Sequence, residues 1–240
     1  MSEWAPKRFW KTAEAVVLEN GYGVVLDGRP VRTPAKAVLW VPSQALAQEV
    51  AVEFDAQADQ IDPRTMPFTR TANAAIDKVA VQQSDVADML AAYGDSDLLC
   101  YRADAPQELV ARQNAQWDPL LDWAAETLNA RLEARVGVIH KPQDPVVLAN
   151  LSKRVHKLTP FELSAFHDLV SISGSLIIGF AAQKCAQVPE DLWDLSRVDE
   201  NWQAEQWGED DDAQQMVAYK KAAFLHADRF MRLINMQSAS

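Results

Sequence analysis

The sequence contains few of the residues on which nucleotide, metal and disulfide chemistry depends. It has eight glycines, four histidines and two cysteines among 240 residues. The single Gly-x-Gly, Gly21-Tyr22-Gly23, lacks the third glycine and the following helix of a phosphate-binding loop. No Cys-x-x-Cys occurs, and no two histidines stand at metal-ligand spacing. We therefore expect neither a cofactor nor a bound metal ion.

Long apolar runs and an excess of positive charge are also missing. The longest strongly apolar stretch, residues 170–182, is interrupted by serines and is shorter than the roughly 20 apolar residues of a membrane-spanning helix. It predicts a buried helix and no insertion into a membrane. The net charge of −11 argues against a nucleic-acid partner, because binding to phosphates depends on Lys and Arg. A basic or neutral protein partner is the better match.

The two cysteines, Cys100 and Cys185, lie far apart among apolar residues. This usage indicates reduced packing residues of a cytosolic protein rather than a disulfide. The opening residues, Met-Ser-Glu-Trp-Ala-Pro, have neither the apolar core of a signal peptide nor the Arg-rich composition of a transit peptide. The sequence therefore predicts a cytoplasmic protein.

Residues 15–41 alternate short β-branched runs with turn-forming residues. Asn20-Gly21 and Asp27-Gly28 separate these runs, and both dipeptides supply the positive φ angles of tight hairpins. Pro42-Ser43 then ends the last strand and caps a helix, in which apolar residues recur every four positions over 46–54. The pattern predicts a β meander followed by a helix.

Prolines 63 and 67 follow this unit and mark a boundary, because the residue before a proline is pushed out of helical geometry. Beyond them the periodicity is mostly helical. The expected helices are 68–92, 106–129, 144–157, 160–185, 190–207 and 212–234, and the extended pieces 97–102 and 131–139 would pair with each other or with the first sheet. We expect an α+β fold, with an N-terminal α+β domain over residues 1–75 and a mainly helical C-terminal domain over 76–240.

Three local motifs refine this expectation. Thr159-Pro160-Phe161-Glu162 is a capping box with proline at the first helical position. Asp118 should cap a helix that Pro119 kinks or restarts, with Trp117 beside it in the core. Ser173-Gly174-Ser175 lies inside a helical apolar pattern without a preceding strand, so we interpret it as small residues at a close helix contact and not as a nucleophile elbow.

The segment Trp207-Gly208-Glu209-Asp210-Asp211-Asp212 joins an aromatic side chain to concentrated negative charge. It has a structural interpretation, in which Gly208 ends one helix with a positive φ and the acids stabilise the N-terminus of the next. It also has a functional one, in which an exposed ring and carboxylates form a recognition surface.

Several short sequence motifs occur together, in an order typical of one protein family, over nearly the whole chain. None of these motifs is specific alone. They are Arg8-Phe9-Trp10-Lys11; residues 26–36; Val41-Pro42-Ser43 with Leu46-Ala47; Ile61-Asp62-Pro63 with Met66-Pro67 and Thr69-Arg70; residues 97–102; Trp117-Asp118-Pro119-Leu120; and the Trp207-Gly208 acidic segment. Together they are similar to the ATP12 family of ATP synthase assembly chaperones.

The resemblance implies a bacterial protein that binds the unassembled α subunit of the F-type ATP synthase catalytic sector and prevents its aggregation until it meets β. It implies no catalytic residues. The acidic position four residues past Trp207 is the one that the resemblance marks as functionally critical, and it is Asp211 here where the family has glutamate. The client-binding residues expected around this helix junction are Glu200, Trp207, Glu209, Asp210 and Asp211.

Two alternatives to the chaperone remain open. The chain could be a constitutive scaffold subunit that stays in the finished ATP synthase. It could also be a metal-dependent hydrolase that uses Glu209, Asp210 and Asp211. The second requires an assembled nucleophile, base and oxyanion donor, and the sequence offers no such set. We therefore expect a binding protein and not an enzyme.

Overall fold

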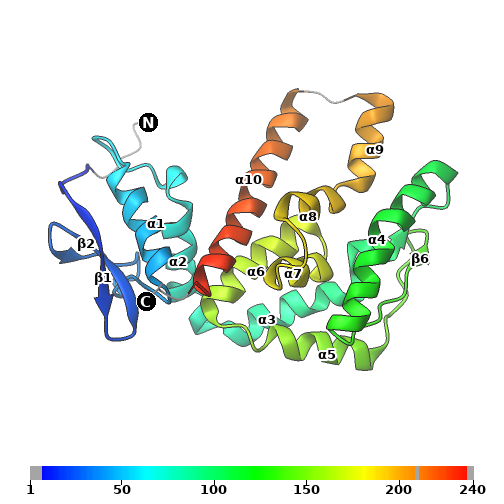
Figure 1. The fold of residues 1–240 in the computed structure, drawn as a ribbon, viewed down its shortest axis with the longest axis horizontal. Helices are drawn as coiled ribbons and strands as arrows, with labels where there is room; N and C mark the ends of the chain where they lie inside the picture. Colours follow the sequence, from blue (N-terminus) through cyan, green and yellow to red (C-terminus); the bar gives the residue numbers. More distant parts are fainter. Residues whose placement is uncertain (1–6, 209–210, 237–240) are drawn as a thin grey trace. The chain divides into compact units, whose positions relative to one another are not determined.

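The computed structural model describes residues 7–208 and 211–236 and divides the chain into two compact units (Figure 1). Unit 1 comprises Met1–Gln83, Thr159–Ala165 and Arg229–Ser240, and unit 2 comprises Ser84–Leu158 and Phe166–Asp228. The helices α6 (Pro160–Ser173) and α10 (Asp211–Ile234) therefore contribute residues to both units. The predicted α+β class is confirmed. The division into domains 1–75 and 76–240 stays a prediction, and the two later segments in unit 1 were not anticipated.

The sheet of unit 1 is built around one central strand. Its strands are β1 (Ala13–Leu18), β2 (Gly21–Leu26), β3 (Arg29–Pro30) and β4 (Trp40–Val41). β1 pairs antiparallel with β2, and both β3 and β4 also pair with β2. Asp27 and Gly28 have φ angles of 47° and 78°, as the predicted tight hairpin between β2 and β3 requires.

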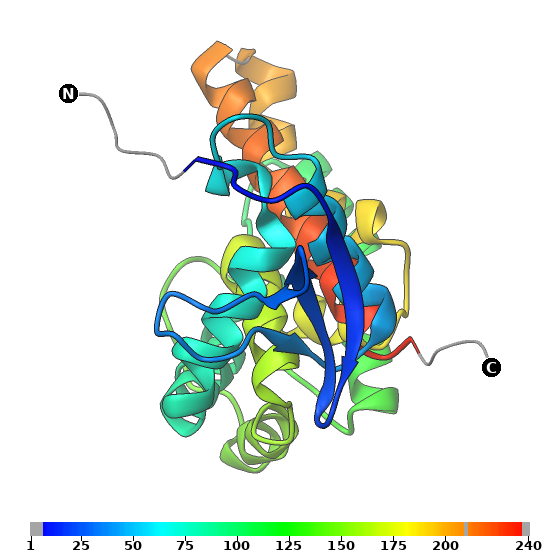
Figure 2. The same cartoon turned by 90° about the vertical axis from the view of Figure 1, so that its left-hand side faces the viewer.

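Helix α1 (Gln44–Asp55) packs against this sheet, and Figure 2 shows the β1–β2 hairpin in front of it. Ser43 Oγ accepts a hydrogen bond from the Leu46 N–H at 3.2 Å, so the predicted cap is confirmed. The predicted apolar stripe is confirmed as well, because Leu46, Val50 and Phe54 are all buried. After the turn η1 (Pro63–Thr65), α2 (Pro67–Asp77) and the turn η2 (Val79–Val81) complete the N-terminal part of unit 1.

Unit 2 is mostly helical. Its elements are α3 (Gln83–Ala91), the 3-10 turns η3 (Ala92–Ser96) and η4 (Leu98–Cys100), β5 (Tyr101–Arg102), α4 (Gln107–Thr127), β6 (Arg135–Val136), α5 (Pro145–Val155), α7 (Leu176–Gln183), α8 (Pro189–Leu195) and α9 (Val198–Trp207), together with parts of α6 and α10. β5 and β6 pair in parallel, so the two predicted extended pieces meet each other and not the first sheet.

Three of the predicted helices are shorter than expected. The helix over 68–92 is interrupted at Lys78, which is followed by the β-branched Val79 and Val81, both weak helix formers. The helix over 190–207 is divided into α8 and α9, and the Leu195 carbonyl at the end of α8 accepts the indole N–H of Trp117 at 2.8 Å. Trp117, which is 78 positions away, thus satisfies a carbonyl group at the end of α8.

The helix over 160–185 is also divided, at the serine-glycine-serine segment. Gly174 has a φ of +72°, which ends α6, and Ser175 caps α7 by accepting from the Ile178 N–H at 3.0 Å. Our interpretation of this segment as a helix interior was therefore wrong. The capping box at the start of α6 is confirmed, because the Glu162 carboxylate accepts from both the N–H and the hydroxyl of Thr159 at 2.8 Å.

Helix α4 runs continuously through Pro119, so the predicted restart is wrong. Asp118 does not cap a helix. Its carboxylate lies 2.8 Å from the guanidinium of Arg102, which is buried and stands over the Trp117 ring at 5.2 Å. Trp117 is fully buried, as expected, and Leu120 is buried beside it, so packing holds the helix where proline removes a hydrogen bond.

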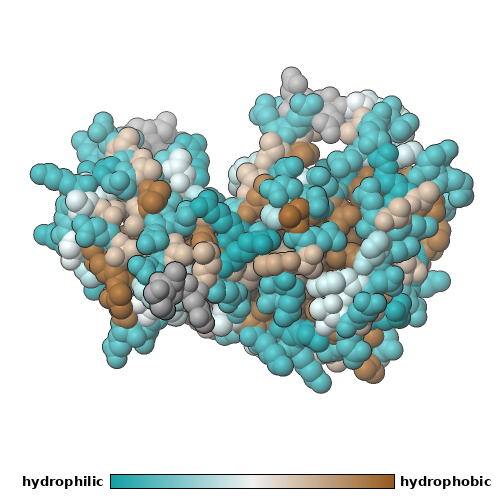
Figure 3. Space-filling view, in the orientation of Figure 1, coloured by the Kyte–Doolittle hydropathy of each residue, from teal (hydrophilic) through white to brown (hydrophobic). Residues whose placement is uncertain are grey.

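Both cysteines are free, but only one is a packing residue. Burial raises the pKa of the Cys100 thiol to about 12, whereas Cys185 is exposed, contrary to expectation. The surface in Figure 3 is largely hydrophilic. Within residues 7–208 and 211–236, none of the helices combines the length and hydrophobicity that crossing a bilayer requires.

Candidate client-binding surface

The candidate surface is formed by the C-terminal part of α9 and the N-terminal half of α10, both in unit 2. Helix α9 is held at its side by α4. Gln113 of α4 donates to the Asp199 carboxylate at 2.6 Å, and the guanidinium of Arg112 lies 4.8 Å from the centre of the Trp202 ring. One side of α9 is thereby fixed against the body of unit 2.

A bidentate ion pair extends this attachment along α9. Both terminal nitrogens of Arg112 donate to the two Glu205 oxygens at 2.8 Å. These hydrogen bonds raise the pKa of Arg112 and lower the pKa of Glu205. Sequence reasoning did not identify Arg112, because nothing in the sequence indicates that it lies beside α9. It is a positioning residue for the candidate surface.

Trp207 is the last residue of α9, and its side chain is 79% exposed. Gly208 follows with a φ of +81°, so the predicted positive φ at this helix end is confirmed. Because a helix repeats every 3.6 residues, Trp207 stands on the same side of α9 as Glu200, about 10 Å further along the axis. Because the Trp207 ring is exposed to solvent, it is available for contact with a partner protein.

The predicted acidic residues are described to different extents. Glu200 is paired at 2.8 Å with Arg197, the residue that precedes its helix, and is half-exposed. Asp211 is the first residue of α10. Glu209 and Asp210 lie outside the described residues. The structure thus places Glu200 and Trp207 on one helix and Asp211 at the start of the next.

Helix α10 adds exposed apolar residues that the sequence analysis did not single out. Met216 is 55% exposed and Tyr219 is 66% exposed, and burial begins only near Phe224. Figure 1 shows this first half of α10 and the end of α9 at the top of unit 2. Spacing alone could not reveal this surface, because exposed and buried helical stripes have the same period.

Among the described residues, no group of three or more acidic, histidine or cysteine side chains is placed to hold a metal ion. The described residues of this surface include an exposed aromatic ring at the end of α9, and acidic residues follow it in the sequence. This combination suits recognition of another protein.

The comparison with known proteins is decisive for the family. A crystal structure of Atp12 from Paracoccus denitrificans is 48% identical to this chain, covers 97% of it and all of that chain, and superposes with a TM-score of 0.94. The chain belongs to the ATP12 family. The family model described as ATP12 chaperone protein matches residues 7–125.

Two further relatives agree. An Agrobacterium tumefaciens protein described as a chaperone is 39% identical over 96% of this chain and 87% of its own, with a TM-score of 0.90. The mitochondrial protein atp12 of Schizosaccharomyces pombe is 26% identical over 223 residues, which cover 88% of this chain and 76% of the yeast protein. The prediction of an ATP synthase assembly chaperone is thus confirmed at the level of the family.

Proposed function

We propose that this protein binds the unassembled α subunit of the F-type ATP synthase catalytic sector and keeps it from aggregating until it meets the β subunit. An isolated α subunit exposes apolar surface that β would cover in the assembled sector, and such surface self-associates. A chaperone that covers it needs an interface, and neither turnover nor a cofactor is required. Membership of the ATP12 family supports this role.

The observation that points to particular residues is the exposed Trp207, which is 79% accessible at the end of α9 and precedes the acidic start of α10 in the sequence. Large aromatic side chains supply much of the binding energy when a partner buries them. Acidic groups around such a ring steer a complementary partner and fix its register. The proposed client-binding residues are Glu200, Trp207, Glu209, Asp210 and Asp211. We add Met216 and Tyr219 to them, because both are apolar and exposed on α10.

The decisive experiment is capture of client proteins by the full-length chain, followed by mass spectrometry. We expect the α subunit to be enriched, and purified α subunit to remain unaggregated in light-scattering assays when the chaperone is added. Absence of the α subunit from a bound fraction that holds unrelated proteins would contradict the proposal. Stoichiometric recovery of the chain with intact ATP synthase would instead identify a constitutive subunit.

A further inference from the structure

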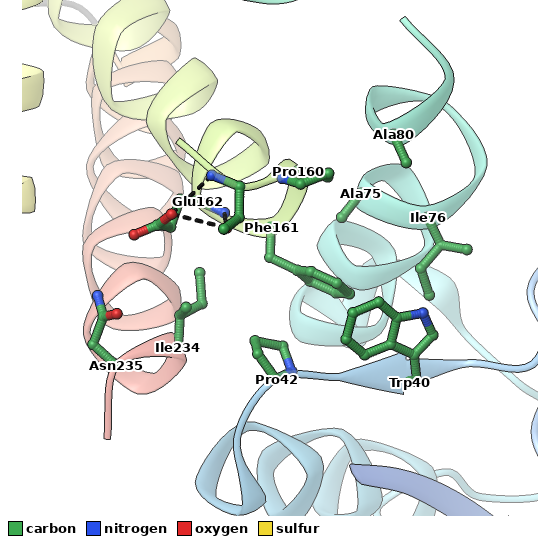
Figure 4. A pocket seen from close by; sticks show the side chains of 11 residues that line it. Trp40, Pro42, Ala75, Ile76, Ala80, Pro160, Phe161, Glu162, Ile234 and Asn235 are labelled. Atoms are coloured by element: carbon green, nitrogen blue, oxygen red, sulfur yellow. Dashed lines mark hydrogen bonds between the residues drawn. The ribbon is translucent and has the colours of Figure 1, made fainter. Parts of the chain in front are cut away.

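Unit 1 contains an apolar pocket whose lining residues are different from those of the α9–α10 surface. Its volume is about 450 Å³, and its walls include Trp40, Ile76, Phe161 and Ile234 (Figure 4). All three segments of the chain that form unit 1 contribute to these walls. Pockets that bind small ligands have volumes of roughly 300 to 1,000 Å³, so this one is large enough for more than one side chain.

Contacts within unit 1 hold the walls in place. The rings of Trp40 and Phe161 meet edge to face, with centroids 4.8 Å apart and planes at 70°. Ser43 Oγ donates to the Leu233 carbonyl at 2.5 Å, which ties the end of α10 to the start of α1 beside Ile234. A pocket whose walls are fixed in this way loses little conformational entropy when it is filled.

The pocket has few polar groups, and the charge among its lining residues is negative. Of its eleven lining residues, Glu162 is the one with a charge, and no Lys, Arg or His stands among them. One oxygen of the Glu162 carboxylate is engaged by Thr159 in the capping box, which fixes the charge at the edge of the apolar walls. Charge complementarity therefore favours an occupant with apolar groups beside a cation and disfavours an acidic one.

We propose that this pocket binds a short polypeptide segment of a partner protein, in which two apolar side chains stand next to a Lys or Arg. The apolar side chains enter between Trp40, Ile76 and Ile234, and the cation pairs with the Glu162 carboxylate. This is a second recognition site, made of residues other than those proposed on α9 and α10. It goes beyond the proposed function, because the class of peptide follows from the pocket and not from the identity of the client.

The test uses the full-length chain with labelled isoleucine methyl groups and two blocked peptides, acetyl-Leu-Phe-Lys-amide and acetyl-Leu-Phe-Glu-amide. We expect the lysine peptide to shift the Ile76 and Ile234 methyl resonances in NMR titrations. The glutamate peptide should bind about two- to five-fold more weakly, the range that an exposed ion pair supplies. No α subunit is present, so failure of the proposed function would leave this result unaffected.

Two pairs of variants separate charge from shape. Glu162→Gln keeps the capping box, because glutamine serves in that motif, and should abolish the preference for the lysine peptide. Glu190→Gln, which changes an exposed acid in the first turn of α8, should preserve it. Ala80→Trp should fill the pocket and abolish binding, whereas Val81→Trp at the neighbouring 82%-exposed position should not.

Three results would overturn the proposal. The first is an absence of methyl shifts with the lysine peptide at its solubility limit. The second is equal affinity of the two peptides for the unmodified chain. The third is a concentration-dependent shift of the same methyl groups without peptide, which would assign the pocket to a second copy of the chain.

Discussion

The carboxylate of Asp97 accepts a hydrogen bond from the backbone N–H of Ile177 at 3.0 Å, across 80 positions of sequence. The same side chain accepts from the Leu99 N–H at 3.0 Å and is completely buried. It thus joins η4 to the first turn of α7 and satisfies N–H groups that the two helical segments leave unpaired. This single side chain links two segments that the sequence shows separately.

Asp97 should make stability depend on pH. Burial raises the pKa of Asp97 to about 6, against about 3.9 in an unfolded chain. A raised pKa stabilises the folded state fully below pH 3.9, and this contribution, on the order of 3 kcal/mol, disappears as pH rises through 6. We expect the unfolding free energy of the wild type to exceed that of Asp97→Asn by an amount that shrinks between pH 4 and pH 7.

The measurement is chemical denaturation of both proteins at several pH values, which cancels the titration of all other groups. A difference that grows with pH would mean that the backbone hydrogen bonds outweigh burial and keep Asp97 ionised.

The two tryptophans Trp117 and Trp207 should respond oppositely to truncation. Trp117 is fully buried and its indole donates to Leu195, so Trp117→Ala should cost about 3–5 kcal/mol. Trp207 is 79% exposed, so Trp207→Ala should leave the denaturation midpoint nearly unchanged while weakening client capture. Denaturation curves beside capture of the α subunit check both. Equal loss of stability in the two variants would contradict the assignment.

Glu53 should stabilise the start of α2 from a different helix. Its buried carboxylate accepts from the N–H groups of Phe68 at 2.6 Å and Thr69 at 2.7 Å, and burial raises the pKa of Glu53. Glu53→Ala would leave both donors unpaired, so we expect a loss of about 1–3 kcal/mol for each that water cannot reach. Glu53→Gln should lose less, because it retains one acceptor. Equal midpoints for all three proteins would show that water replaces the carboxylate.

The charge of Asp211 separates recognition from capping. Under the proposed function, Asp211→Asn should leave folding nearly intact but weaken capture of the α subunit. The loss should be largest at low salt, because exposed charges are screened over about 8 to 10 Å near physiological ionic strength. Asp211→Glu should retain capture, since it restores the acid that the family resemblance implies.

Capture by each Asp211 variant is compared with its thermal midpoint. If Asp211→Asn captures the α subunit as well as the wild type does, the role of Asp211 is only to stabilise the helix N-terminus, by about 0.3 to 1 kcal/mol. A loss of capture in proportion to stability would lead to the same conclusion.

Local signals in the sequence determined the local structure. The Asp27-Gly28 turn, the Ser43 cap, the capping box at Thr159 and the positive φ at Gly208 each depend on a few neighbouring residues, and all four are present. The order of the short motifs along the chain was sufficient to identify the family, and the change from strand to helical periodicity was sufficient to predict the mixed fold class. These properties are encoded within short windows, so no knowledge of long-range contacts was needed.

Only the tertiary structure decided which side chains remain exposed and which ones pair over long distances in the sequence. The Leu195 carbonyl is taken by a tryptophan from another helix, and Asp118 pairs with a buried arginine where local rules predicted a cap. Met216 and Tyr219 have the spacing of a buried stripe yet face solvent, and the pocket at Trp40 joins three remote stretches of chain. Helical periodicity shows that residues share a face, but burial depends on whether another element covers that face, and this follows from long-range packing alone.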